Sequence, residues 1–246
     1  YGPCGGEVSV HAWGPGAAWC LETAGDLLGG RDRLDGFEPR GLVRELHRRL
    51  PGLRISRSLT VFEALVPSVL EQKVTGQEAH ASYRAVVRAW GTPAPGPVPL
   101  LVPPGPDVLA SRAYWEFHRF GVEMKRANTI RAAAACAARL EEAAGMPAPD
   151  AHRRLQVVPG VGPWTAAEVA IVALGDADAV SVGDYHLPHL VSWSLAGEPR
   201  GTDERMLELL APYAGHRGRV LRLLTRAGRS APRFGPRMPL RSFRRF

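Results

Sequence analysis

The sequence feature that most constrains the fold is a glycine- and proline-rich turn at residues 159–163 (PGVGP), which separates two helical patterns. Residues 152–157 predict a short helix before the turn, and the apolar residues after Trp164 repeat at helical spacing. Pro163 suits the first turn of a helix, where its missing N–H is not needed. Glycines permit close backbone approach, and the N–H groups of a new helix point outward, so this turn can hold a phosphate without a basic side chain. The simpler interpretation is an ordinary corner between two helices.

An acidic residue follows this turn by about twenty positions. Asp184 lies in residues 181–187 (SVGDYHL), after the second helical pattern has ended at Gly175. An Asp between a loop and a helix is usually an N-cap residue. His186 and His189 lie three residues apart beside it, as two metal ligands can, but a metal site needs more ligands, so we expect solvated or capping histidines.

Composition bounds the class of protein. The 246 residues are enough for one or two domains with their own cores. The net charge is +7, and residues 215–246 contain ten Arg and no Asp or Glu. A basic C-terminal region fits a polyanionic partner, although a solubilising tail is a fair alternative. The three cysteines are widely spaced, which predicts reduced thiols in the cytoplasm, and no apolar run reaches the ~20 residues of a membrane span.

Most of the remaining chain reads as helical. Residues 1–38 are the exception, since they contain short strand-like runs and predict the edge of a β-rich element. Thr60 and Glu63 match a capping box at the start of a helix. Residues 91–106 contain seven prolines and predict an extended surface loop. Helices are expected at 41–50, 60–70, 75–90, 109–120, 125–144, 187–195, 204–210 and 219–226.

Together, the PGVG turn and the downstream VGD segment resemble the helix-hairpin-helix DNA glycosylases, and the order of elements is similar to bacterial 3-methyladenine DNA glycosylase II. Residues 69–72 (VLEQ) and 164–166 (WTA) also match motifs of that family. The resemblance implies a mainly α fold of two helical domains with a helix-hairpin-helix motif at about 152–175, plus a short, possibly truncated, N-terminal β-rich segment. The implied units are 1–38 as the remnant of a β-rich domain, 39–62 with 177–229 as one helical domain, 63–176 as the other, and 230–246 as a basic tail.

The resemblance also implies which residues form the site. Asp184 would be the catalytic acid, and Trp164 and Glu168 would line the base pocket. The residues that would contact DNA are Gly160, Gly162, Thr165, Gln72 and Lys73. A monovalent cation, Na⁺ or K⁺, would bind the main-chain carbonyls of Gln156, Val158 and Val161. No cofactor is expected for the chemistry, and no iron–sulfur cluster.

Three positions depart from the family pattern. Lys73 stands where the family has an apolar wedge that fills the gap left by the extruded base. Glu168 stands where it has a Tyr, and a position near Thr225 stands where it has a Trp. Two aromatic walls of the base pocket are therefore missing, which counts against broad capture of alkylated bases by stacking.

We therefore expect a monofunctional DNA N-glycosylase that flips and excises alkylated (3-methyladenine-type) or otherwise damaged bases and leaves an abasic site. A carboxylate beside the sugar would stabilise the positive charge that develops as the base leaves. A lyase needs an amine nucleophile, and the hairpin position that carries it in bifunctional members is Trp164, so no lyase activity is expected. The expected partner is damaged double-stranded DNA and the expected form a monomer in the bacterial cytoplasm, without a membrane partner. The alternative is a non-catalytic helix-hairpin-helix DNA-binding or damage-recognition protein; a protein–protein scaffold has only the proline-rich loop in its favour.

Overall fold

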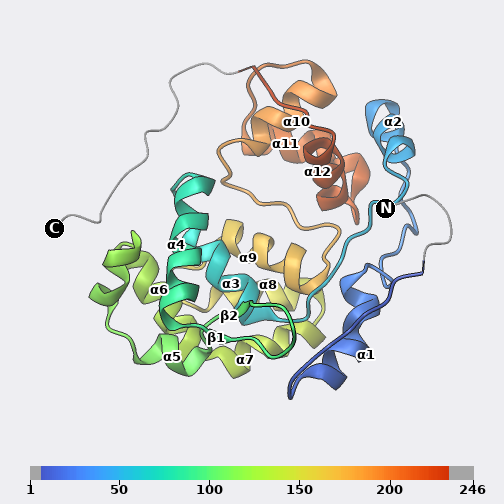
Figure 1. Cartoon of the computed structure of the whole chain (residues 1–246). Coiled ribbons are helices and arrows are strands. Elements are labelled where there is room, and N and C mark those ends of the chain that lie inside the picture. The colour runs from blue at the N-terminus through green and yellow to red at the C-terminus, as the bar shows by residue number, and fades with distance from the viewer. Residues whose placement is uncertain (1–6, 233–246) are drawn as a thin grey trace.

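The computed structural model describes residues 7–232, and nearly all of its regular structure is helical (Figure 1). The mainly α fold expected from the sequence is therefore confirmed. The α-helices are α1 (Ala17–Leu27), α2 (Gly41–Arg49), α3 (Val61–Leu70), α4 (Gly76–Trp90), α5 (Pro106–Ser111), α6 (Met124–Ala135), α7 (Ala137–Glu141), α8 (Ala148–Gln156), α9 (Pro163–Val169), α10 (Leu187–Ala196), α11 (Asp203–Leu210) and α12 (Arg217–Arg226). The shorter helical turns are η1 (Tyr114–Phe120), η2 (Glu142–Gly145), η3 (Ala170–Leu174), which is a π-helix that continues α9, and η4 (Ala211–Tyr213).

The helices bury two main groups of apolar side chains. The larger group comes from the helices between α3 and η3, with α3 at its centre, since eight of the ten α3 residues are buried. The other group comes from α2, α10, α11 and α12. Figure 1 shows α10, α11 and α12 as a bundle above the body that contains α3 and α9. The residue limits of the two predicted domains stay a prediction.

The expectation of a β-rich segment at 1–38 is wrong for the part that the structure describes. Residues 17–27 form α1, and no strand occurs between residues 7 and 38. The Ala, Leu and Glu residues of α1 favour a helix, whereas the loose alternation at 7–13 lacks a partner strand and is mostly exposed. Asp32 ties this segment to α12, because its carboxylate accepts a hydrogen bond from Arg219 Nη1 at 2.9 Å and both side chains are buried.

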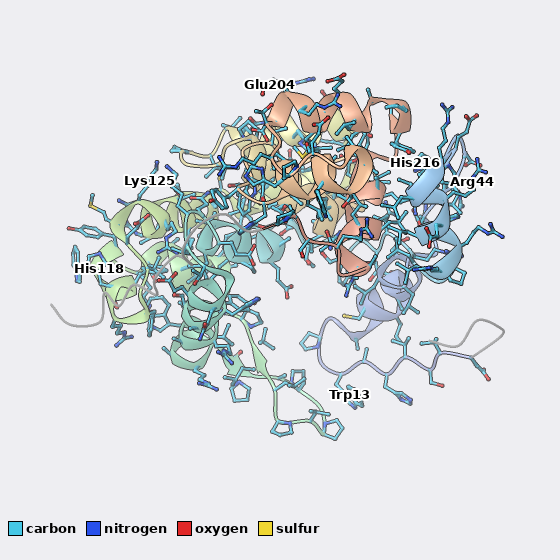
Figure 2. The ribbon with its side chains drawn as sticks, turned by 90° about the horizontal axis from the view of Figure 1, so that it is seen from above. Trp13, Arg44, His118, Lys125, Glu204 and His216 are labelled. Atoms are coloured by element: carbon cyan, nitrogen blue, oxygen red, sulfur yellow. The ribbon has the colours of Figure 1, made fainter. Side chains whose placement is uncertain are left out.

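The proline-rich segment is more ordered than a plain loop. Strands β1 (Thr92–Pro93) and β2 (Leu101–Val102) pair antiparallel within it and form the one sheet found in residues 7–232. Its tip touches the N-terminal segment, because a side chain at Gly96 would begin 3.0 Å from the Trp13 ring, which Figure 2 labels. A cavity of about 430 Å³ lies between this segment and α3, α4 and α7, and no predicted site residue lines it.

The start of α3 differs from its predicted capping box. The Thr60 side chain makes no cap hydrogen bond. Instead, the carboxylate of Glu141, 80 residues away in sequence, accepts hydrogen bonds from the N–H groups of Val61 and Phe62 at 2.8 and 2.9 Å. A capping box does form at α4, between Thr75 and Glu78. A tertiary contact therefore replaced the local cap, because a carboxylate satisfies the same free N–H groups from any part of the chain.

The two predicted helices at 109–120 and 125–144 are both interrupted. The first is divided into α5, which begins earlier at Pro106, and the 3₁₀ turn η1. The second is divided at Cys136, whose backbone (φ −123°, ψ 21°) leaves the helical region between α6 and α7. The apolar spacing located both segments correctly and missed these breaks.

Candidate functional site

The predicted hairpin forms between α8 and α9. Gly160 has a φ of +91°, in the left-handed region that favours glycine, and Gly162 is extended and precedes Pro163, the first residue of α9. Ala166 N–H donates to Gly162 O, so within residues 7–232 the N–H groups of Trp164 and Thr165 have no backbone acceptor. Free N–H groups at a helix start are suited to bind an anion.

Gln72 joins this hairpin to the end of α3. Its side-chain amide donates to Gly160 O at 3.0 Å and to Thr165 Oγ1 at 2.8 Å. Lys73 is exposed at the next position, with a left-handed φ of 55° that non-glycine residues rarely adopt. The structure thus brings the predicted DNA-binding residues at 72, 160 and 165 into contact, and places Lys73 directly beside them.

Arg126 holds the end of α3 in place, and the sequence analysis did not single it out. Its guanidinium is 2 % exposed and donates to Leu70 O at 2.7 Å and to Gly121 O at 3.2 Å. Because Leu70 ends α3, these bonds also position the turn that carries Gln72 and Lys73. The sequence gave little sign of this role, since Arg126 lies in an Ala-rich helix that also has other basic residues.

We expect Gln72→Ala to loosen the hairpin. The change removes two hydrogen bonds, each contributing about 1 kcal/mol, so the free energy of unfolding should fall by about 1–2 kcal/mol. Affinity for duplex DNA should fall several-fold, because Gly160 and Thr165 lose a common anchor. Thermal unfolding and fluorescence anisotropy on duplex DNA measure the two effects. Gln77→Ala, an exposed glutamine of α4, is the matched control, and equal behaviour of the two variants would contradict the anchoring role.

Asp184 lies at the start of α10 and also contacts the hairpin helix. Its Oδ1 accepts hydrogen bonds from the N–H groups of His186 and Leu187 at 2.7 and 2.9 Å, as an N-cap residue does. Its Oδ2 accepts the indole N–H of Trp164 at 3.0 Å. The capping and functional interpretations are therefore compatible, because each uses a different carboxylate oxygen. The neighbouring Tyr185 is 78 % exposed.

Glu168 forms a second polar contact between α9 and the same loop. It lies one turn after Trp164 and therefore on the same face of the helix. The buried Ser181 hydroxyl donates to Glu168 Oε1 in a short hydrogen bond. Burial raises the pKa of Glu168, and the charges of Glu71 and Asp184 raise it further, while the Ser181 hydroxyl and Arg222 act in the opposite direction. Glu168 therefore faces the end of α3, the loop before α10, and α12 at once.

Arg222 is the residue of α12 that faces this cluster, and the sequence analysis did not single it out. Burial lowers its pKa, and the charge of Glu168 partly offsets that effect. Thr225, the position considered from the sequence, is instead exposed, and its hydroxyl donates to Leu221 O of its own helix. The helical pattern of α12 separated inner from outer apolar residues correctly but could not show which arginine turns toward α9. Ser181 was likewise treated as ordinary loop.

The metal alternative at the histidines is not supported. Within residues 7–232, no group of three or more His, Cys, Asp or Glu side chains could hold a metal ion. His189 Nδ1 accepts a hydrogen bond from Gly201 N–H at 3.0 Å, which gives it a structural role. In the same part of the chain, no helix is both long and apolar enough to cross a membrane.

No protein-family model matches the chain. A 147-residue segment, 59 % of the chain, is 33 % identical to a probable bifunctional transcriptional activator/DNA repair enzyme AlkA of Mycobacterium tuberculosis, and it spans 29 % of that relative. Among solved structures, a 3-methyladenine DNA glycosylase from Archaeoglobus fulgidus superposes with a TM-score of 0.71 and 21 % identity, over 85 % of this chain and 73 % of that one. The chain has the helix-hairpin-helix DNA glycosylase fold.

Two further structures share this fold. The Clostridium acetobutylicum 8-oxoguanine glycosylase/lyase has a TM-score of 0.70 and 14 % identity, over 85 % of this chain and 75 % of that one. The Schizosaccharomyces pombe 3-methyladenine DNA glycosylase, in complex with abasic DNA, has a TM-score of 0.64 and 18 % identity, over 78 % of this chain and 92 % of that one. The resemblance inferred from the hairpin and the downstream Asp is confirmed at the level of the fold.

Proposed function

We propose that this protein is a monofunctional DNA N-glycosylase, which extrudes an alkylated (3-methyladenine-type) or otherwise damaged base from duplex DNA and hydrolyses its glycosidic bond. The observation that carries the proposal is the hydrogen bond from Trp164 to Asp184, because it places a carboxylate beside the start of the hairpin helix. The names of the structural neighbours, which include 3-methyladenine and 8-oxoguanine glycosylases, support it. The curated relative, named as a DNA repair enzyme, supports it as well.

The hairpin and Asp184 divide the work in this proposal. The free N–H groups around Gly160, Gly162 and Thr165 hold a backbone phosphate, so binding depends on salt and little on sequence. The extruded nucleotide then lies between α9 and the loop that carries Asp184. As the glycosidic bond breaks, positive charge develops on the sugar, and the carboxylate of Asp184 stabilises it and orients the attacking water.

The hairpin can also hold a monovalent cation in this proposal. Gln156 ends α8, while Val158 and Val161 lie in the turn that follows. The carbonyl oxygen of Val158 accepts the N–H of Val161 at 3.0 Å, and a carbonyl oxygen has a second lone pair available. The main-chain carbonyls of these three residues would bind Na⁺ or K⁺ and stiffen the turn, without a part in the chemistry.

The decisive test measures base release from duplexes that carry one damaged base each, methylated purines included. A glycosylase converts the lesion into an abasic site, which alkali then cleaves, and mass spectrometry identifies the free base. The alternative, a non-catalytic damage-recognition protein, would retard the same duplexes in a gel and release no base. Binding without release from every duplex would therefore favour the alternative.

We expect borohydride reduction during turnover to trap no covalent protein–DNA adduct. A lyase forms a Schiff base through an amine, and the chain contains two lysines only. Lys73 is exposed on the turn after α3, and Lys125 lies in α6 on the α4–α6 side of the molecule (Figure 2). Lys73→Ala should still release base and should bind damaged duplex more weakly. An adduct that disappears in Lys73→Ala would overturn the monofunctional assignment.

A further inference from the structure

The cluster around Glu168 contains hydrogen-bonding groups that the proposed reaction does not use. Asp184 is held by Trp164 and by the start of α10, whereas Glu168 is held by Ser181 alone among its hydrogen-bond partners in residues 7–232. In the same part of the chain, the half-buried Arg222 makes no hydrogen bond and no ion pair within 4 Å. A half-buried guanidinium without a partner is unfavourable, so its presence points to a ligand that completes its hydrogen bonds.

The free atoms of this cluster form a donor beside an acceptor. Ser181 occupies Glu168 Oε1, which leaves Oε2 to accept a hydrogen bond, and Arg222 offers several N–H donors. The two residues reach this place from α9 and α12, and their charges interact. A lactam edge, in which a ring N–H stands beside a C=O, is complementary to such a pair.

Charge and shape oppose the methylated purines whose excision the family resemblance suggests. A 3-methylated or 7-methylated purine nucleotide carries a positive charge, which the fixed charge of Arg222 repels. Cations bind best over aromatic faces, but Glu168 and Thr225 stand where two aromatic walls were expected, and Trp164 remains. Glu71 and Asp184 are the other charged groups that act on Glu168, and they lie at the end of α3 and the start of α10.

Resting on the proposed glycosylase activity, we propose that Glu168 and Arg222 are specificity-determining residues that select a neutral, deaminated base with a lactam edge, such as hypoxanthine or uracil, over cationic methylated purines. Guanine and thymine have the same edge, so the pair alone does not distinguish damage. The distinction comes from extrusion, which costs least for a base that is mispaired in the duplex. Deamination products opposite their original partners meet this condition.

The test compares base release from duplexes that contain hypoxanthine opposite thymine, uracil opposite guanine, 3-methyladenine or 7-methylguanine, in single-turnover reactions. We expect release of the two deaminated bases to be at least tenfold faster than release of the methylated purines. Arg222→Met should reverse this order, lowering the rate for deaminated bases by at least tenfold, because a site built to hydrogen-bond an edge loses most when the partner is removed. Glu168→Tyr, which restores an aromatic wall, should raise the rate for methylated purines.

Arg226→Met is the matched control, because Arg226 lies one turn later on α12, is exposed, and carries the same charge. It should leave the ratio between the two classes of base unchanged, and thermal unfolding should show that each variant is folded. A preference for methylated purines that Arg222→Met leaves unaltered would overturn this inference and keep the glycosylase assignment. No release of any base by the wild-type protein would instead overturn the proposed function itself.

Discussion

Asp184→Asn should lower base release by at least about 10²–10³-fold, the range found when a group that stabilises transition-state charge is removed. The amide still accepts the N–H groups of His186 and Leu187 at the start of α10, so the local fold should persist. What is lost is the negative charge beside the sugar. Duplex affinity should change by no more than a few-fold, because the phosphate contacts of the hairpin are intact. Single-turnover release and anisotropy measure the two quantities.

Asp203→Asn is the control for this variant. The Asp203 carboxylate accepts the N–H of Gly183 at 2.9 Å and so contacts the same loop, but it does not contact Trp164. Its loss of charge should leave the rate of base release within a few-fold of wild type. If Asp184→Asn retained near-normal turnover, another group would have to stabilise the sugar, and the role assigned to Asp184 would be wrong.

Gly160→Ala should destabilise the protein, whereas Gly162→Ala should not. A Cβ on Gly160 would collide with Thr129 Oγ1 and lie 3.2 Å from Thr129 Cβ, and the φ of +91° is strained for any L side chain. Thr129 is buried in α6 and has little room to move. Left-handed strain of roughly 1–2 kcal/mol and over-packing of roughly 1–3 kcal/mol together predict a loss of about 2–4 kcal/mol.

Gly162 provides the internal comparison. Its backbone is extended, and a Cβ there would have no heavy atom within 4 Å, so we expect a change in unfolding free energy within about 0.5 kcal/mol. The added methyl group would instead obstruct the approach of a phosphate and lower duplex affinity by at least tenfold. Calorimetry should place the Gly160→Ala melting temperature roughly 5–15 °C lower. Equal stability of the two variants would contradict the packing argument, and unchanged affinity of Gly162→Ala would remove the phosphate from this face.

The sequence by itself determined the hairpin and the helices around it. Two glycines and a proline before an apolar 3.6-residue pattern permit few structures, because glycine admits a left-handed turn and proline favours a helix start. The same local logic located α2, α4, α10 and α12. It failed at residues 7–38, where the loose alternation is too short to require a strand and α1 forms beside it.

Only the tertiary structure decided which distant groups meet. Glu141 caps α3 from 80 residues away, Gln72 reaches the hairpin across 88, and Arg222 faces Glu168 from another helix. The family resemblance could propose Asp184 from its spacing to the hairpin, but it could not assign Ser181, Arg126 or Arg222. A hydrogen bond or charge interaction depends on distance in space, and periodicity along the chain records only which face of an element is buried. The local pattern therefore predicts elements, and packing of those elements against one another determines the chemistry of the site.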